Sequence, residues 1–325
     1  MRQVKKIGVL TSGGDAPGMN AAIRAVTRAA LHHHIEVYGI MRGYEGLING
    51  EIKKMYSSDV SGIIQKGGTI LQTARSVSFR TPEGRVQARE NLKKFDIDSL
   101  IVIGGDGSFA GASIFSREHN FPEIGIPGTI DNDLYGTEYT NGYDTALNTV
   151  VEAVDKIKDT ASSHNRIFFV EVMGREAGFL ALMSGIACGA EAILIPEVPG
   201  QIEKLMNYLS LRGQQKKSSI ILVAEGEDEG GAIAVSKKVQ TAFPQFDIRV
   251  TILGHIQRGG SPTTHDRVTA SRLGVAAVEA LLDDQTSIMV GIDNNQIVHV
   301  PLSKTIKLHK TVDSQLLEVA EILIG

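Results

Sequence analysis

Short apolar runs alternate with longer amphipathic segments along the whole chain. The short runs are rich in Val, Ile and Leu, which is typical of strands buried on both faces. They predict strands at Lys6–Thr11, Glu36–Ile40, Ser99–Ile103, Glu123–Ile126, Arg166–Val172, Ala192–Ile195, Ser219–Ala224 and Arg249–Leu253. The longer segments predict helices at Met19–His32, Gln87–Phe95, Phe109–Arg117, Thr145–Ser162, Gly178–Gly189, Ile202–Arg212, Ala232–Ala242 and Asp266–Leu282. This alternation predicts an α/β fold whose parallel sheets carry helices on both faces.

The overall composition is that of an ordinary globular protein, with 42% hydrophobic and 22% charged residues among 325. This length allows two domains or lobes. The net charge is −4 and the chain has no Trp, so nothing favours a nucleic-acid backbone or an anionic membrane as a partner. Any phosphate site must therefore come from local clusters of Arg.

The chain has a single cysteine, Cys188, which excludes an intrachain disulfide. Its apolar surroundings predict a buried, inert thiol, and a chain without disulfides fits a reducing cytoplasm. The first apolar run, IGVL, is too short for a signal peptide. The uncharged segment from Gly178 to Ala190 is also short, which predicts a core helix and not a membrane span.

Two aspartates follow the expected strand that ends at Ile126. Pro127-Gly128 ends this strand, and Thr129, Asp131 and Asp133 come next. Ligands of open α/β sheets bind where loops leave the carboxyl ends of the strands. Two carboxylates at that edge suit general-base work or metal binding. A plain surface turn is the alternative, because Asp and Asn are common in turns.

Glycine loops follow two other expected strands. Gly104-Gly105-Asp106-Gly107-Ser108 leads into the helix expected from Phe109, and Ser12-Gly13-Gly14-Asp15 leads into the helix expected from Met19. A strand, a glycine loop and a helix N-terminus together offer backbone N–H groups to a phosphate. An aspartate among the glycines would repel phosphate unless a divalent cation lay between them, which points to a magnesium nucleotide. The alternative for the first loop is a strand-to-helix turn with Ser108 as N-cap.

Five arginines stand at expected strand ends or beside glycines: Arg75, Arg166, Arg175, Arg249 and Arg258. Each taken alone is compatible with a solvated surface charge, but the set suits bidentate phosphate contacts. His255 shares a glycine-flanked loop with Arg258, which favours a substrate contact for this histidine as well.

With these motifs assembled, the chain resembles the bacterial ATP-dependent 6-phosphofructokinases over nearly its full length. The segments TSGGDAPGMNAAIRA, IGGDGS, PGTIDND, DTASSHNR, VMGR and LGHIQRGGSP occur in the order of that family. The GGDG motif alone is shared with NAD kinases and diacylglycerol kinases, but those lack the PGTIDND and HIQRGG segments. The resemblance implies phosphorylation of fructose 6-phosphate by ATP with Mg²⁺, a committed step of glycolysis.

The resemblance also implies two Rossmann-like three-layer lobes with mainly parallel sheets. The larger, ATP-binding lobe would comprise residues 1–142 and about 257–307. The smaller, sugar-phosphate-binding lobe would comprise about 143–256 and 308–325.

The resemblance assigns catalytic roles to Asp131 as the base, to Thr129 beside it and to Arg175 near the transferred phosphoryl group. Asp106 would hold Mg²⁺. The ATP contacts would be Gly14, Arg75, Ser76, Gly105, Asp106, Gly107 and Ser108. The fructose 6-phosphate contacts would be Thr129, Ile130, Asp131, Arg166, Met173, Gly174, Arg175, Glu225, Arg249, His255, Ile256, Gln257 and Arg258.

Members of the family are usually homotetramers with shared active sites, in which Arg166 and Arg249 would reach the 6-phosphate from a neighbouring subunit. A second phosphate site for ADP or phosphoenolpyruvate would use Arg24, Arg28, Gly189, Glu191 and Lys216. Weaker or altered effector control is expected, because Ser57, Lys158, Gln214 and Ser218 stand where the family often has Arg, Arg, Lys and His.

Local departures also occur after Arg175 and at Ser76 to Ser78, where the contact with adenine or ribose is expected to differ. Two alternatives to the ATP-dependent kinase are a pyrophosphate-dependent relative and a non-catalytic sugar-phosphate sensor. A sensor would be expected to lose the base or the magnesium ligand, and both Asp131 and Asp106 are present.

Overall fold

A computed structural model describes residues 4–164, 166–212 and 218–323 of the chain. The chain divides into two compact units. Unit 1 comprises Met1–Ile130, Leu134–Thr145 and Arg258–Lys310, and unit 2 comprises Asp131–Asp133, Ala146–Gln257 and Thr311–Gly325. Each unit has its own sheet and its own hydrophobic core.

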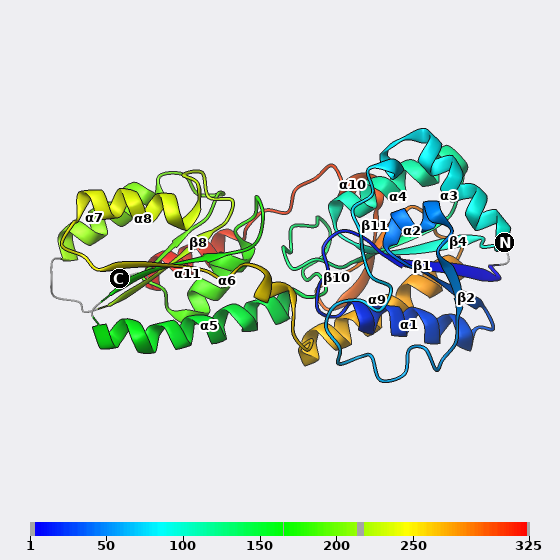
Figure 1. Ribbon diagram of the computed structural model, residues 1–325, viewed down its shortest axis with the longest axis horizontal. Coiled ribbons are helices and arrows are strands. Elements are labelled where there is room, and N and C mark those ends of the chain that lie inside the picture. The colour runs from blue at the N-terminus through cyan, green and yellow to red at the C-terminus, as the bar shows by residue number, and fades with distance from the viewer. Residues whose placement is uncertain (1–3, 165, 213–217, 324–325) are drawn as a thin grey trace. The chain divides into compact units, whose positions relative to one another are not determined.

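Unit 1 is built on a seven-stranded sheet (Figure 1). Its central strands are parallel, whereas the strand at each edge is antiparallel to its neighbour. In spatial order the strands are β11 (Gln296–Pro301), β10 (Ile288–Asp293), β5 (Glu123–Pro127), β4 (Ser99–Gly104), β1 (Lys6–Thr11), β2 (Glu36–Ile40) and β3 (Ile52–Met55). Strands β4 and β5 are buried along their whole length, which explains their continuous apolar runs.

Helices cover both faces of this sheet (Figure 1). One face carries α1 (Met19–His32) and α9 (Thr264–Leu282). These helices pack closely at Gly274, where a Cβ would lie only 2.5 Å from the Ala25 Cβ. The other face carries α2 (Gly43–Asn49), η1 (Ser78–Arg80), α3 (Pro82–Lys94), α4 (Asp106–His119) and α10 (Leu302–Thr305). Their apolar side chains and those of β4 form one core cluster around Phe109 and Phe115.

Unit 2 has a four-stranded parallel sheet. In spatial order its strands are β7 (Ala192–Leu194), β8 (Ser219–Ala224), β6 (Ile167–Val172) and β9 (Ile248–Ile252). Helices α7 (Gln201–Arg212) and α8 (Gly231–Ala242) pack their apolar residues on one face. The other face carries α5 (Tyr143–His164), α6 (Phe179–Cys188) and α11 (Ser314–Leu323), while η2 (Gly254–Arg258) follows β9.

The predicted α/β class with mainly parallel sheets is confirmed, and every predicted strand and helix is present to within a few residues at its ends. The sequence analysis missed the short helices α2 and α10, the C-terminal helix α11, and strands β3, β10 and β11. Helix α3 begins at Pro82, five residues before its predicted start, because Thr81 accepts a hydrogen bond from Gly84 N and caps it.

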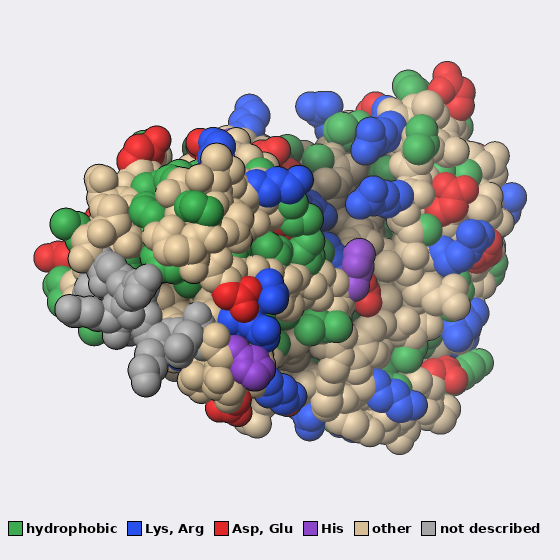
Figure 2. All heavy atoms as spheres, turned by 60° about the vertical axis from the view of Figure 1, so that its left-hand side comes forward, with side chains coloured by type: hydrophobic (Ala, Val, Ile, Leu, Met, Phe, Trp, Pro, Cys, Tyr) green, Lys and Arg blue, Asp and Glu red, His purple; other side chains and the backbone are tan. Residues whose placement is uncertain are grey.

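Two composition-based expectations also have structural outcomes. Cys188 is buried at the end of α6, as predicted, and burial raises the pKa of its thiol to about 11. Within the described ranges, no helix combines the length and the apolar character needed to cross a bilayer. Basic and acidic side chains are interspersed on the face of the molecule shown in Figure 2.

Glu123 is an unusual residue in the core of unit 1. It opens β5 beside Leu100 of β4, and none of its surface is exposed. Neither of its carboxylate oxygens has a hydrogen-bond partner among the described residues. Burial raises the pKa of Glu123 well above its usual range, so the folded protein holds this carboxyl protonated at pH values where the unfolded chain has released the proton.

We expect Glu123→Gln to flatten the pH dependence of stability. The raised folded-state pKa makes wild-type stability fall as pH rises from the unfolded-state value of about 4.3 toward the folded-state value. For one such proton, the unfolding free energy changes by at most about 1.4 kcal/mol per pH unit. Urea unfolding of the wild type and of Glu123→Gln at pH 5, 6 and 7 measures this slope, and the exposed Glu279→Gln is the control for loss of a surface carboxyl. Parallel curves for wild type and Glu123→Gln would show that Glu123 ionises normally.

Candidate active site

Three loops meet at the carboxyl edge of the unit 1 sheet, because they follow the adjacent strands β1, β4 and β5. The Ser12 N–H donates to the Ile103 carbonyl at 2.9 Å, and the Gly128 N–H donates to the Gly104 carbonyl at 2.9 Å. A Cβ at Gly104 would lie 2.6 Å from the Ser12 carbonyl oxygen, so only glycine allows this approach. The two glycine loops and the segment containing Thr129 therefore form one continuous surface.

The second glycine loop contributes the start of a helix. Helix α4 begins at Asp106 and not at the predicted Phe109, so Gly107 and Ser108 lie in its first turn and Ser108 is not the N-cap. The positive end of the helix dipole and the first backbone N–H groups suit a phosphate. Asp106 is exposed there, and a Cβ at Gly107 would meet nothing within 4 Å.

The guanidinium of Arg258 lies against the first glycine loop. Arg258 Nη1 donates to the Asp15 carbonyl at 3.4 Å, and a Cβ at Gly14 would lie 1.9 Å from the same nitrogen. A side chain at position 14 would therefore displace the Arg258 guanidinium from its place against the loop. The structure therefore brings a predicted ATP contact and a predicted sugar-phosphate contact together within unit 1.

The other two predicted ATP contacts lie between β3 and α3. Arg75 is exposed. The Ser76 hydroxyl donates to Glu45 Oε2 at 2.7 Å and accepts from Phe79 N at 3.1 Å. Ser76 is thus engaged in holding its own segment, and a ligand would compete with Glu45 for its hydroxyl.

The boundary between the units passes through the loop after Gly128, since Ile130 belongs to unit 1 and Asp131 to unit 2. Asp131 is 1% exposed, and its Oδ2 lies 3.2 Å from Arg175 Nε. The structure therefore pairs the predicted base with the predicted phosphoryl-stabilising cation. The Arg175 side chain is 53% exposed, which leaves much of the guanidinium open to a ligand.

Arg175 has a strained backbone that neighbouring residues hold in place. Its φ is +54°, in the left-handed region that disfavours a residue other than glycine. Glu225 Oε1 accepts hydrogen bonds from Arg175 N at 2.7 Å and from Gly174 N at 3.3 Å. Glu225, a predicted sugar-phosphate contact, thus fixes the turn that presents Arg175.

The remaining contacts near this turn come from η2. Gln257 is fully buried and its Oε1 accepts from Met173 N at 3.1 Å, so it supports the turn. His255 and Ile256 are exposed on η2. Of the predicted η2 residues in unit 2, Gln257 is thus structural in this conformation, whereas His255 is accessible to a ligand.

Arg166 and Arg249 lie at the opposite end of the unit 2 sheet. Arg166 directly precedes the six-residue strand β6, and Arg175 follows its other end. Six extended residues span about 20 Å, so these two arginines cannot share one phosphate within the unit. Arg249 pairs with Phe168 near the same amino end, beside Arg166.

The predicted effector residues are divided between the units. In unit 1, Arg24 and Arg28 lie one turn apart on α1, and burial together with the Arg28 charge lowers the pKa of Arg24. In unit 2, Gly189 is exposed after α6, and Glu191 Oε2 accepts from Ile220 N at 2.7 Å. Lys216, like Gln214, lies outside the described residues.

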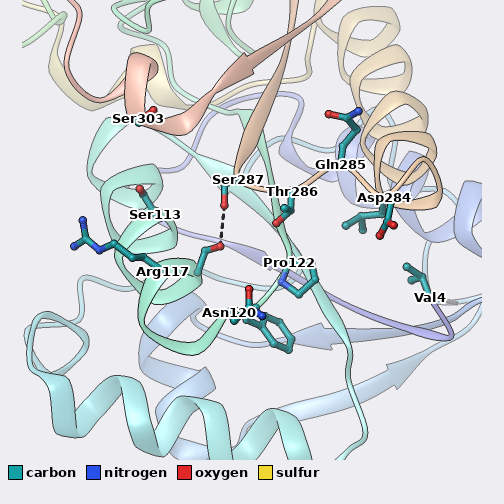
Figure 3. A pocket seen from close by; sticks show the side chains of 13 residues that line it. Val4, Ser113, Arg117, Asn120, Pro122, Asp284, Gln285, Thr286, Ser287 and Ser303 are labelled. Atoms are coloured by element: carbon teal, nitrogen blue, oxygen red, sulfur yellow. Dashed lines mark hydrogen bonds between the residues drawn. The ribbon is translucent and has the colours of Figure 1, made fainter. Parts of the chain in front are cut away.

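A pocket of about 440 Å³ lies elsewhere in unit 1, at the amino end of β5 and the carboxyl end of α4 (Figure 3). The hydroxyls of Ser116 and Ser287 are hydrogen-bonded to each other at 2.8 Å in its wall. It is lined by Val4, Ser113, Ser116, Arg117, Asn120, Phe121, Pro122, Leu281, Asp284, Gln285, Thr286, Ser287 and Ser303. The pocket is thus at the opposite edge of the sheet from the glycine loops.

Sequence reasoning missed two carboxylates that contact predicted site residues. Glu45 accepts from Ser76, and Asp247 forms ion pairs with Arg166 and Arg249. Asp247 lies 81 residues from Arg166 in the chain, and only the strand register of the folded sheet brings the two together.

The chain is similar to known proteins over nearly its whole length. A family model described as phosphofructokinase matches residues 6–281. The chain is 60% identical over 320 residues to ATP-dependent 6-phosphofructokinase 2 of Bacteroides thetaiotaomicron, covering 98% of each chain. It is 53% identical to ATP-dependent 6-phosphofructokinase of Cytophaga hutchinsonii, covering 99% of this chain and 98% of the relative. A structure of phosphofructokinase from Saccharomyces cerevisiae superposes with a TM-score of 0.86 at 41% identity, covering 98% of this chain and 48% of that one.

Proposed function

The chain belongs to the phosphofructokinase family, and we propose that it transfers the γ-phosphoryl group of ATP to the 1-hydroxyl of fructose 6-phosphate. The products are fructose 1,6-bisphosphate and ADP, and the general role is a step of glycolysis. The observation that carries the proposal is the buried Asp131 carboxylate beside the Arg175 guanidinium. A base and a cation in contact are what the attack of a hydroxyl on a phosphoryl group requires.

Asp131 takes the proton of the 1-hydroxyl as that oxygen attacks the γ-phosphorus. Arg175 stabilises the negative charge that develops on the phosphoryl oxygens. Most of the remaining work is positioning, because phosphoryl transfer demands little covalent chemistry of the protein. The clamp of Glu225 on two consecutive N–H groups supports this role, since it holds Arg175 in a conformation that it would otherwise leave.

The nucleotide phosphates are assigned to the loop from Gly105 to Ser108 and to Gly14. The open space at Gly107 supports this assignment. Mg²⁺ fits the donor set here, because Asp106 offers an exposed carboxylate beside the loop. Mg²⁺ usually takes one or two carboxylates together with substrate phosphates and water. When bound, it would neutralise charge on the phosphate oxygens.

The sugar phosphate is assigned to residues that surround Asp131 and Arg175, with His255 and Met173 as contacts and the 6-phosphate bound by Arg166 and Arg249 of a neighbouring subunit. The length of β6, about 20 Å, supports the sharing of sites. It keeps Arg166 and Arg249 too far from Arg175 of the same subunit to bind the same substrate molecule. A homotetramer in the cytoplasm with ADP or phosphoenolpyruvate as a weakly bound effector at Arg24 and Arg28 completes the proposal.

Asp131→Asn is expected to bind both substrates but to lose most of its turnover. The amide is nearly isosteric but cannot accept the proton, and a general base typically contributes about 10²–10⁴-fold. Steady-state kinetics should place the loss in kcat, with the KM values of ATP and fructose 6-phosphate little changed. A near-normal kcat would remove Asp131 from the base role.

ATP is expected to be a better phosphoryl donor than pyrophosphate. By the resemblance to the phosphofructokinases, pyrophosphate-dependent members would have Asp in place of Gly107 and Lys in place of Gly128, whereas this chain has glycine at both positions. An aspartate at position 107 would repel a nucleotide phosphate, whereas the glycine leaves open space. A coupled assay with fructose 6-phosphate compares the two donors and tests the whole proposal.

Gly107→Asp provides the matched variant for this assay. A Cβ at this position meets nothing within 4 Å, so the variant should fold normally and lose turnover with ATP. Faster turnover of the wild type with pyrophosphate would support the pyrophosphate-dependent alternative, and no turnover with either donor would support the sensor.

Mixed tetramers should recover activity if the sites are shared. Asp131→Asn subunits lack the base, Arg249→Ala subunits lack a 6-phosphate contact, and a mixed pair can build one complete site. Mixing Asp131→Asn with Arg175→Ala is the control, because both residues lie on the same side of the site in contact with each other. Equal activity of both mixtures after proven subunit exchange would contradict a shared site.

A further inference from the structure

One carboxylate bridges the two arginines at the amino end of the unit 2 sheet. Asp247 Oδ2 lies 2.7 Å from Arg166 Nε, and Asp247 Oδ1 lies 2.7 Å from Arg249 Nη1. Each oxygen of the carboxylate therefore holds one guanidinium, and the hydrogen bond from Arg166 lowers the pKa of Asp247 below its usual range. The carboxylate is thus charged at neutral pH.

The backbone fixes this arrangement. Strands β6 and β9 are parallel with Ile167 opposite Ile248, which puts the preceding residues Arg166 and Asp247 side by side. The Ile167 N–H donates to the Asp247 carbonyl at 3.0 Å, so the pairing extends to Asp247 itself. Arg249 Nη1 also donates to the Ile248 carbonyl at 3.0 Å, which restrains the second guanidinium.

We propose that Asp247 is a positioning residue for substrate binding, which orients Arg166 and Arg249 toward the 6-phosphate of fructose 6-phosphate. The inference rests on the proposed function, because it takes those two arginines as the 6-phosphate contacts. The bond from Arg166 uses its Nε, so the edge formed by the two terminal nitrogens is directed elsewhere and suits bidentate contact with a phosphate.

Two physical effects make such a residue useful. Two neighbouring guanidinium groups repel each other, and a bridging carboxylate offsets that repulsion. Arginine side chains also lose rotamer freedom when they bind, and a carboxylate that orders them beforehand reduces this loss on binding. The cluster contributes little to the folding stability, because solvent-exposed ion pairs are weak. The side chains of Arg166, Asp247 and Arg249 are 27%, 41% and 50% exposed.

The test is steady-state kinetics of the full-length enzyme with Asp247→Ala. The KM for fructose 6-phosphate should rise roughly tenfold, the loss that corresponds to one charge-assisted hydrogen bond. The kcat, the KM for ATP and the thermal midpoint should stay close to wild type. Asp247→Glu keeps a carboxylate and should recover part of the affinity, and Asp247→Asn should recover less.

The control is Glu321→Ala, which removes another exposed ion pair of unit 2, that with Lys204 at 2.8 Å. It should leave the KM for fructose 6-phosphate unchanged. The double variant Asp247→Ala with Arg249→Ala should raise this KM by less than the product of the two single effects, since both changes act on one contact.

The outcomes separate this inference from the proposed function. If Arg249→Ala and Arg166→Ala raise the KM for fructose 6-phosphate but Asp247→Ala leaves it unchanged, only the role of Asp247 is overturned. A lower KM in Asp247→Ala would also overturn it, because the carboxylate would then be a competitor of the phosphate. If neither arginine variant changes this KM, the assignment of the 6-phosphate site fails and the role of Asp247 fails with it.

Discussion

The site depends on the hydrogen-bond register of three neighbouring parallel strands, β1, β4 and β5. Ile7 lies opposite Ser99, and Leu100 lies opposite Glu123, so the three strands end at nearly the same level. Parallel strands place their carboxyl ends at one edge, and this register turns three loops that are far apart in the sequence into one surface. A shift in one strand would separate the glycine loops and remove the phosphate-binding surface that we propose.

The buried strands could be predicted from the sequence because continuous apolar runs leave few alternatives. The strands β6 and β8, with a run of apolar residues each, were found to within a residue. The hairpin of β10 and β11 was missed, although Asn294 and Asn295 have φ values of +47° and +60° and form the turn that such a pair favours. Helix α2 was missed because Gly43 and Gly46 weaken the helical pattern, whereas the fold needs glycine at position 46 to avoid the Met41 carbonyl.

The sequence indicated which residue types stand at the strand ends, but not which of these residues contact each other. The motifs pointed to Asp131 and Arg175 individually, but their contact at 3.2 Å joins residues 44 positions apart and follows only from the folded chain. The same holds for Asp247, whose partners are set by strand register and not by any local motif. Local patterns therefore identify residue types at strand ends, and tertiary pairing decides which of them act together.

The left-handed backbone of Arg175 affects which substitutions at this position would stabilise the protein. A residue with a side chain in the left-handed region costs about 1–3 kcal/mol, and here the two N–H bonds to Glu225 offset that cost. Glycine at position 175 would relieve the strain, but it would remove the cation beside Asp131. Stability and the activity that we propose therefore oppose each other at this position, and selection for heat resistance alone would favour replacing Arg175 by glycine.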